Sequence, residues 1–143
     1  RAFVAEKGKC LVTFDYSQIE LRLAAILSED EKMIEIFKSG EDVHAAVAMA
    51  LFHLPAEAIT KEMRRRAKVI NFGILYGMGV NALRENLGGE RAEAQEYLNG
   101  YFHAFSGLAA YIAKTKATAA RLGYTTTLFG RAAMRCWSRA GSC

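Results

Sequence analysis

Helical periodicity runs through most of the chain, interrupted mainly by residues that begin or end helices. Apolar residues recur at helical spacing in six segments, which we expect to be helices: 19–27, 29–37, 43–52, 61–77, 90–105 and 108–122. Ser28, Asp42 and Thr60 stand where N-terminal caps are needed. Because 52% of the 143 residues are hydrophobic, the chain can bury a core, and the helices should pack as one unit.

Short β-type runs flank the helical part. Residues 10–15, CLVTFD, are apolar and β-favouring, and the preceding RAFVAEKGK contains Gly8 as a candidate turn, so we expect a hairpin. After Gly123, the run YTTTLFG predicts a terminal strand. The predicted fold class is therefore α+β and mostly helical, with one hairpin, six helices and one strand.

The segment 61–77 combines a charged ridge with an apolar face. Residues four apart lie on one ridge of a helix, and here that ridge is Arg64, Lys68, Phe72 and Tyr76. The opposite face carries Met63, Ala67, Ile70 and Ile74, which should face a core. Arg64 and Phe72 would be about 12 Å apart along the axis, close to the length of a nucleoside triphosphate. The ridge favours a nucleotide lying along this helix.

A simpler interpretation of this segment is a solvated basic face. Cations near the N-terminus of a helix oppose its dipole by about 0.3–1 kcal/mol each. Arg65 and Arg66 suit such a solvated face, or a face turned toward DNA. The aligned rings and Gly73, which costs about 1 kcal/mol against alanine inside a helix, favour the binding interpretation.

Asp15 stands where the β-type run stops and the first helix starts. A carboxylate at such a junction can be held rigidly toward a cleft, although it can also cap the helix, with Ser17 as a rival cap. A Mg²⁺ site in phosphate chemistry commonly uses one or two carboxylates plus substrate oxygens. Glu20 lies five residues further on, a spacing that does not by itself make a ligand pair.

Composition narrows the class of protein only partly. The net charge of +4 and the pI of about 9.1 suit a polyanionic partner as well as many proteins without one. Three cysteines without metal-ligand spacing argue against a disulfide framework and favour a reducing cytoplasm. No run is long and apolar enough to span a membrane, and no leader peptide opens the sequence. A start at Arg1 without methionine suggests a fragment.

Two long motifs resemble those of the family A DNA polymerases, the bacterial DNA polymerase I type. DYSQIELR (residues 15–22) is similar to motif A, and RRRAKVINFGILYG (residues 64–77) is similar to motif B. GEDVHAAVA and YTTTLFGR also look like this family, so the resemblance covers residues 1–131. It implies template-directed DNA synthesis with Mg²⁺, in which a primer 3′-hydroxyl attacks the α-phosphate of a deoxynucleoside triphosphate. Primer-template DNA would be the partner, and no obligate protein partner is implied.

The resemblance assigns roles to matching positions. Asp15 would be a ligand of two Mg²⁺ ions, with the backbone carbonyl of Tyr16 completing one site, and Glu20 would be a steric gate against a ribose 2′-hydroxyl. Arg64, Lys68 and His44 would grip the triphosphate, and Lys68 would also deliver a proton to the pyrophosphate. The remaining implied substrate and DNA contacts are Gln18, Asn71, Phe72, Gly73, Tyr76 and Arg131. His44 is otherwise interpreted as a half-buried helix residue.

Within this group, Phe72 would pack on the sugar and the nascent base pair. Tyr76 would stack at the template site and pair with Glu20 to tighten the sugar gate. Asn71 and Gly73 would let the helix approach the base pair.

The same resemblance implies a division of the chain. Residues 1–27 would be part of the palm with motif A, residues 28–122 the fingers with the motif B helix at about 61–77, and residues 123–131 a strand returning to the palm. Residues 132–143 depart from the family pattern and are taken as an aberrant tail. The third family motif, with the second metal-binding aspartate, is absent from the sequence, so we expect the isolated chain to be inactive. Its expected location is the bacterial cytoplasm, on the nucleoid.

Two rival functions stay open. A single-subunit RNA polymerase shares the motif A aspartate and the basic spacing of motif B, although Glu20 and Phe72 argue against it. A non-catalytic helical DNA-binding module would use the basic segment alone, and it predicts salt-dependent duplex binding without a response to triphosphates.

Overall fold

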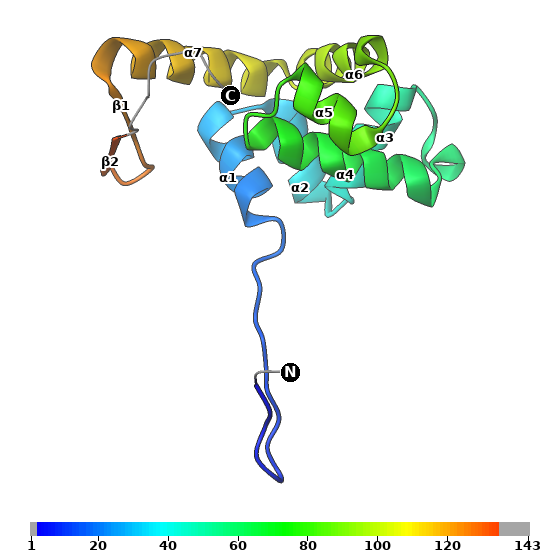
Figure 1. Cartoon of the computed structure of the whole chain (residues 1–143), viewed down its shortest axis with the longest axis vertical. Coiled ribbons are helices and arrows are strands. Elements are labelled where there is room, and N and C mark those ends of the chain that lie inside the picture. The colour runs from blue at the N-terminus through cyan, green and yellow to red at the C-terminus, as the bar shows by residue number, and fades with distance from the viewer. Residues whose placement is uncertain (1–2, 135–143) are drawn as a thin grey trace.

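The structure is a computed structural model that describes residues 3–134. Seven α-helices, one 3-10 turn and two strands make up this part of the chain (Figure 1). They are α1 (Ile19–Ser28), α2 (Glu31–Ser39), α3 (Val43–Phe52), η1 (Ala56–Ala58), α4 (Lys61–Leu75), α5 (Val80–Leu87), α6 (Arg91–Ala104), α7 (Ser106–Leu122), β1 (Tyr124–Thr126) and β2 (Ala132–Met134). The mostly helical α+β class is confirmed.

The core lies where α1 to α6 and the start of α7 pack together. α4 packs mainly against α3, α5 against α6, and α1 against α7. Leu21, Met33, Ile70, Tyr101 and Phe105 are fully buried there. The apolar face predicted for α4 is confirmed at Ala67, Ile70 and Ile74, which are at most 5% exposed. The opposite ridge of α4 is therefore left free to face outward. No helix within residues 3–134 is long and apolar enough to cross a membrane.

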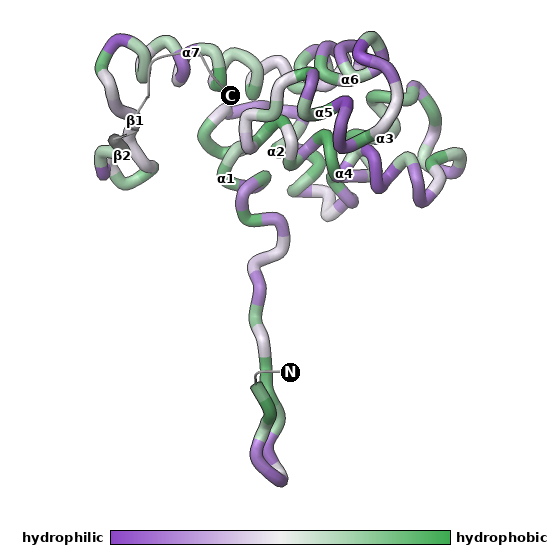
Figure 2. Tube along the Cα trace, viewed as in Figure 1, coloured by the Kyte–Doolittle hydropathy of each residue, from purple (hydrophilic) through white to green (hydrophobic). Residues whose placement is uncertain are grey.

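The hairpin predicted before α1 is wrong in part. The turn forms at Gly8, where φ is 81° and the Lys9 N–H donates to the Glu6 carbonyl at 3.0 Å. No strand is assigned between residue 3 and β1, and this segment projects from the helices as an arm (Figure 1). Figure 2 shows hydrophobic stretches along it, and Phe3 and Phe14 are 84% and 93% exposed. A two-stranded hairpin without a packed face is only marginally stable, which explains the difference.

Helix boundaries follow the predicted caps except in one place. Thr60 accepts the Met63 N–H at 3.2 Å, and Asp42 accepts the His44 N–H at 2.9 Å, so both predicted caps form. Ser28 instead ends α1, and Asp30 caps α2. The capping-box pattern at Ser28 is thus overruled by a stronger cap two residues later, since a carboxylate is a good acceptor at this position.

The helix α5 is missing from the prediction. Glycine pairs flank it on both sides, Gly77 with Gly79 and Gly88 with Gly89, and such pairs are typical of turns. Leu83 and Leu87 nevertheless bury one face of α5 in the core. Burial of this short apolar face outweighs the local signal of its flanks.

The terminal strand is shorter than predicted and has a partner. Within residues 123–131 only β1 is a strand, and it pairs antiparallel with β2, with Thr125 opposite Ala133. β2 lies in the segment predicted as an aberrant tail, and the rest of that tail lies outside the described residues. Figure 1 shows this small sheet at the C-terminal end of α7, away from the helix cluster.

A buried carboxylate joins two helix starts. Asp30, which is 4% exposed, accepts the Met33 N–H at 3.0 Å with Oδ1 and the Leu108 N–H of α7 at 3.2 Å with Oδ2. Gly107 makes this approach possible, because a Cβ at that position would lie 2.9 Å from the Asp30 Cα. The absence of a side chain at Gly107 therefore fixes how α7 meets α2.

Replacing Gly107 by alanine is expected to destabilise the chain by about 1–3 kcal/mol, because the new Cβ must displace backbone. Gly100→Ala is the matched control. Its Cβ would meet only the flexible end of Leu51, at 3.3 Å, and alanine is the better helix former. Urea unfolding of the two variants measures the difference. Equal stability of both would show that the start of α7 can shift freely.

Candidate functional site

A pocket of about 400 Å³ lies where the arm enters α1 and meets α3 and α4. Its lining is Asp15, Tyr16, Ser17, Gln18, Ile19, Glu20, His44, Arg64, Lys68 and Phe72. All of these except Ser17 and Ile19 are predicted site residues. Three segments far apart in the sequence are thus brought together by the packing of α1 and α3 against α4.

The two pocket cations of α4 differ in their surroundings. The Nε and Nη2 groups of Arg64 both lie close to Oδ2 of Asp42, at 2.6 and 2.5 Å. Lys68 is exposed and has no acidic partner within 4.0 Å among residues 3–134. Arg64 is therefore held in place, while the ammonium group of Lys68 is available to a ligand.

His44 is buried, at 3% exposure, and is oriented through its ring and its backbone. Its Nδ1 lies 2.9 Å from Nδ2 of Asn71, an amide nitrogen that can only donate. Burial lowers the pKa of His44, and so do Arg64 and Lys68, while Asp42 opposes the shift. The neutral ring therefore carries its proton on Nε2. That nitrogen bonds to no other described residue and keeps solvent contact, so it presents a donor to the pocket.

Aromatic rings continue the ridge beyond the cations. The rings of Phe72 and Tyr76 are stacked with centroids 6.3 Å apart, and Phe72 also lies 5.7 Å from the ring of His44. The Tyr76 hydroxyl donates to Oε1 of Glu20 at 3.3 Å, and the charge of Glu20 raises the pKa of Tyr76. The structure thus places Glu20 and Tyr76 in the contact that the resemblance implies.

Four of the predicted substrate and DNA contacts do not line this pocket: Asn71, Gly73, Tyr76 and Arg131. Asn71 is fully buried behind His44, and Gly73 is buried against the turn after α4, where a Cβ would lie 3.0 Å from Sδ of Met78. Arg131 follows the turn between β1 and β2, at the end of α7 remote from α4 in Figure 1. Asn71 supports His44 from behind, and Gly73 lets the turn after α4 pack closely on the helix. Tyr76 reaches the site through its bond to Glu20, and Arg131 belongs to another part of the surface.

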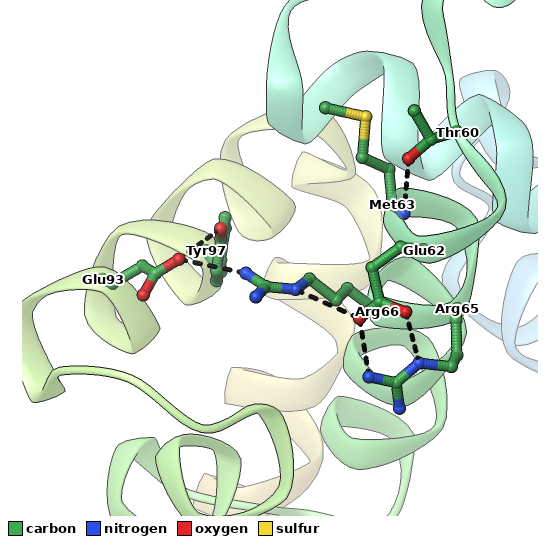
Figure 3. Close-up of polar contacts among 7 residues, drawn as sticks. All are labelled: Thr60, Glu62, Met63, Arg65, Arg66, Glu93 and Tyr97. Atoms are coloured by element: carbon green, nitrogen blue, oxygen red, sulfur yellow. Dashed lines mark hydrogen bonds and ion pairs between the residues drawn. The ribbon is translucent and has the colours of Figure 1, made fainter.

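The other two arginines of α4 are engaged elsewhere. Figure 3 shows Arg66 pointing toward α6, where its Nη1 donates to Glu93 at 3.2 Å. Arg65 bonds to Glu62 at 2.6 and 2.8 Å, one turn back on the same helix. The basic run is thus not a uniform cationic patch, because acids of this chain neutralise its middle part. Arg64 and Lys68 are the cations of this run that reach the pocket.

The pocket offers part of a hard-cation site. Mg²⁺ prefers oxygen ligands and commonly takes one or two carboxylates together with substrate oxygens. Asp15 and Tyr16 both line the pocket, so the Asp15 carboxylate and the Tyr16 backbone carbonyl are the candidate oxygens, while Glu20 is bonded to Tyr76. Within residues 3–134 no group of three His, Cys, Asp or Glu residues could hold a metal by itself. These oxygens could form one side of a Mg²⁺ site, which would need further ligands to be complete.

Asp42 is a site neighbour that the sequence identifies only as a helix cap. Its second oxygen binds Arg64, which the helical pattern does not predict. The available signal is its chemistry: a carboxylate cap has a further oxygen for a cation, whereas a hydroxyl cap such as Thr60 has none.

The chain resembles known proteins in sequence and in fold. The model of the family described as DNA polymerase family A matches residues 1–136. The thermostable DNA polymerase I of Thermus aquaticus is 49% identical over 131 residues, which cover 92% of this chain and 16% of that protein. DNA polymerase I of Pseudomonas aeruginosa is 46% identical over 131 residues, covering 92% and 14%. The chain thus spans less than a fifth of the length of these relatives.

Among solved structures, the chain is similar to the POL domain of Pol1 from M. smegmatis, determined in complex with DNA primer-template and dNTP. The TM-score is 0.78 and the identity 39%, over 84% of this chain and 21% of that chain.

Proposed function

Because this chain belongs to DNA polymerase family A, we propose that it supplies the pocket that binds the incoming deoxynucleoside triphosphate during template-directed DNA synthesis. The observation that carries the proposal is the convergence of Asp15, His44 and the first three residues of the α4 ridge on one pocket. We assign residues 28–122 to the fingers, and residues 1–27 and 123–131 to the palm. The proposed location of the protein is the bacterial cytoplasm, on nucleoid DNA.

The phosphates are proposed to lie over Arg64, Lys68 and the Nε2–H of His44. These three groups are hydrogen-bond donors, and the two cations give charge-assisted bonds to phosphate oxygens. Lys68 has no acidic partner within the described residues, so it is free to transfer a proton to the leaving pyrophosphate as a general acid. His44 adds a donor without adding charge, because its neutral ring presents Nε2–H to the pocket.

Asp15 and the Tyr16 carbonyl are proposed to hold Mg²⁺ at the α-phosphate end of the pocket. When bound, the ion stabilises charge on the attacking and leaving oxygens of the displacement. The chain contributes one free carboxylate there, because Glu20 is engaged by Tyr76. We therefore propose that the 143-residue chain alone does not sustain synthesis, and that the complete polymerase adds a second carboxylate.

The sugar and the base are proposed to meet Phe72, Glu20 and Tyr76. Phe72 is fixed between the rings of His44 and Tyr76, so it offers a flat apolar surface to the sugar. Glu20, held by the Tyr76 hydroxyl, stands as a gate against a 2′-hydroxyl. This gate favours a DNA polymerase over the single-subunit RNA polymerase alternative. Gln18, Tyr76 and Arg131 are the proposed contacts to primer-template DNA, while Asn71 and Gly73 act from behind the site.

The DNA-binding module is the weaker alternative. It needs a continuous basic face, whereas Arg65 and Arg66 are paired with Glu62 and Glu93 (Figure 3). A duplex would have to compete with both pairs for these cations.

Lys68→Ala and Arg64→Ala should each weaken dATP binding to the 143-residue chain roughly tenfold, because each removes a charged hydrogen bond to phosphate. Arg65→Ala is the matched control. It removes the same charge from the same helix, but at a residue that bonds to Glu62 outside the pocket. Titration with dATP, followed by NMR or calorimetry, measures the dissociation constants of the three variants. A loss as large for Arg65→Ala would mean that general basicity, and not the pocket, attracts the nucleotide.

A further inference from the structure

We propose that Asp42 is a positioning residue that holds Arg64 and His44 together as one preorganised phosphate-binding unit. This inference rests on the proposed triphosphate site, and it assigns a role to an acid that no ligand is expected to touch. Asp42 is not among the residues that line the pocket. It can therefore affect a bound nucleotide mainly through its neighbours.

The two oxygens of Asp42 have separate tasks. Oδ1 accepts the backbone N–H of His44 at 2.9 Å and that of Ala45 at 3.4 Å, which caps α3. Oδ2 accepts from Nε of Arg64 at 2.6 Å and lies 2.5 Å from its Nη2. One carboxylate thus fixes the start of the helix that carries His44 and the side chain of Arg64 on α4.

The geometry leaves part of the guanidinium free. An arginine has five N–H donors in a rigid plane, and Asp42 occupies the edge formed by Nε and Nη2. The Nη1 group remains for phosphate oxygens, and Arg64 still lines the pocket. Because the plane is rigid, holding one edge also sets the direction of the other.

A second link joins the same two helices. His44 on α3 bonds through Nδ1 to Asn71 on α4, and the Oδ1 of Asn71 is buried with no partner among the described residues. Leaving a buried carbonyl unpaired is unfavourable. The amide nevertheless turns its nitrogen to His44, which leaves its own oxygen unpaired among the described residues. Asp42 bonds to both helices, and Asn71 bonds to His44. His44 on α3 and Arg64 on α4 therefore have little freedom to move apart.

The sign of the expected effect separates this role from simple electrostatics. A negative charge beside a triphosphate site should repel the ligand, so removing it would tighten binding if charge alone mattered. The Asp42 and Arg64 side chains are 36% and 46% exposed, so solvent and salt screen this repulsion. Loss of the ordered guanidinium is then the larger effect, since the ligand itself must order a long side chain.

The test uses Asp42→Asn and Asp42→Ser, which keep an acceptor for the α3 cap but lose the ion pair. Glu62→Gln is the matched control, because it breaks an exposed arginine pair on the same helix outside the pocket. Affinity for dATP is measured with the 143-residue chain. KM and kcat for dNTP are measured in a chimera, in which the matching residues of this chain replace the stretch that they match in the Thermus aquaticus relative.

We expect both Asp42 variants to raise the dATP dissociation constant and the KM about three- to tenfold, with kcat and the melting temperature nearly unchanged. Glu62→Gln should leave both the dATP dissociation constant and the KM unchanged. In an Arg64→Ala background, Asp42→Asn should have no further effect, because the two residues act as one unit. Unchanged or tighter binding in the Asp42 variants, or additive losses in the double variant, would overturn the proposal.

Failure of this inference is distinguishable from failure of the proposed function. If Arg64→Ala weakens dATP binding and Asp42→Asn does not, the site stands and the positioning role is wrong. If Arg64→Ala also leaves binding unchanged, the triphosphate site itself is misplaced.

Discussion

Replacing Asp15 by asparagine in the chimera is expected to reduce nucleotide incorporation roughly 10³-fold or more, with primer-template binding largely unchanged. Asparagine keeps the size of the side chain and one oxygen, but removes the charge that a divalent cation requires. Stabilising the charge that develops around the attacked α-phosphate is worth several kcal/mol, and this sets the size of the loss in rate. Single-turnover incorporation measures it.

The control for this substitution lies on the same arm. Glu6→Gln also removes one exposed carboxylate, in this case the partner of Lys9 at the turn, outside the pocket. It should leave synthesis close to that of the parent chimera. Retained synthesis in Asp15→Asn would show that the metal ligand has been assigned to the wrong carboxylate, and a parallel loss of DNA binding would point to misfolding of the arm instead.

Periodicity predicts the parts of this site that lie on one helix. The ridge of Arg64, Lys68 and Phe72 and the buried face beneath it depend only on residues three or four apart, which a regular helix places in fixed relation. Both faces of α4 are therefore found as expected. The start of α4 at Thr60 is equally local, because a cap bonds to an amide three residues away.

Contacts between helices are not predicted in this way. Whether Arg66 meets solvent or Glu93 is decided by the packing of α4 near α6. The two residues are 27 positions apart in sequence, so no local pattern relates them. The same holds for Asn71, which the motif places near a base pair and the fold places behind His44. The missing strands of the arm have another cause: their apolar side chains have no surface to pack on within the described residues.

The sugar end of the pocket gives the second large effect. Glu20→Ala in the chimera should lower the preference for dNTP over rNTP about 10²-fold, because removing the side chain opens room for a 2′-hydroxyl. The size follows from the limited discrimination that a pocket achieves against one added hydroxyl. The ratio of kcat/KM values for the two nucleotides is the measurement, taken in the same buffer for both.

Tyr76→Phe separates the gate from its support. It removes only the hydroxyl that bonds to Glu20 at 3.3 Å and keeps the ring stacked on Phe72, so the preference should fall only a few-fold. A loss as large as that of Glu20→Ala would make the hydroxyl, and not the carboxylate, the gate. An unchanged ratio in both variants would remove Glu20 from sugar selection. Preferential use of rNTP by the unsubstituted chimera would favour the RNA polymerase alternative, because a gate at Glu20 requires the opposite preference.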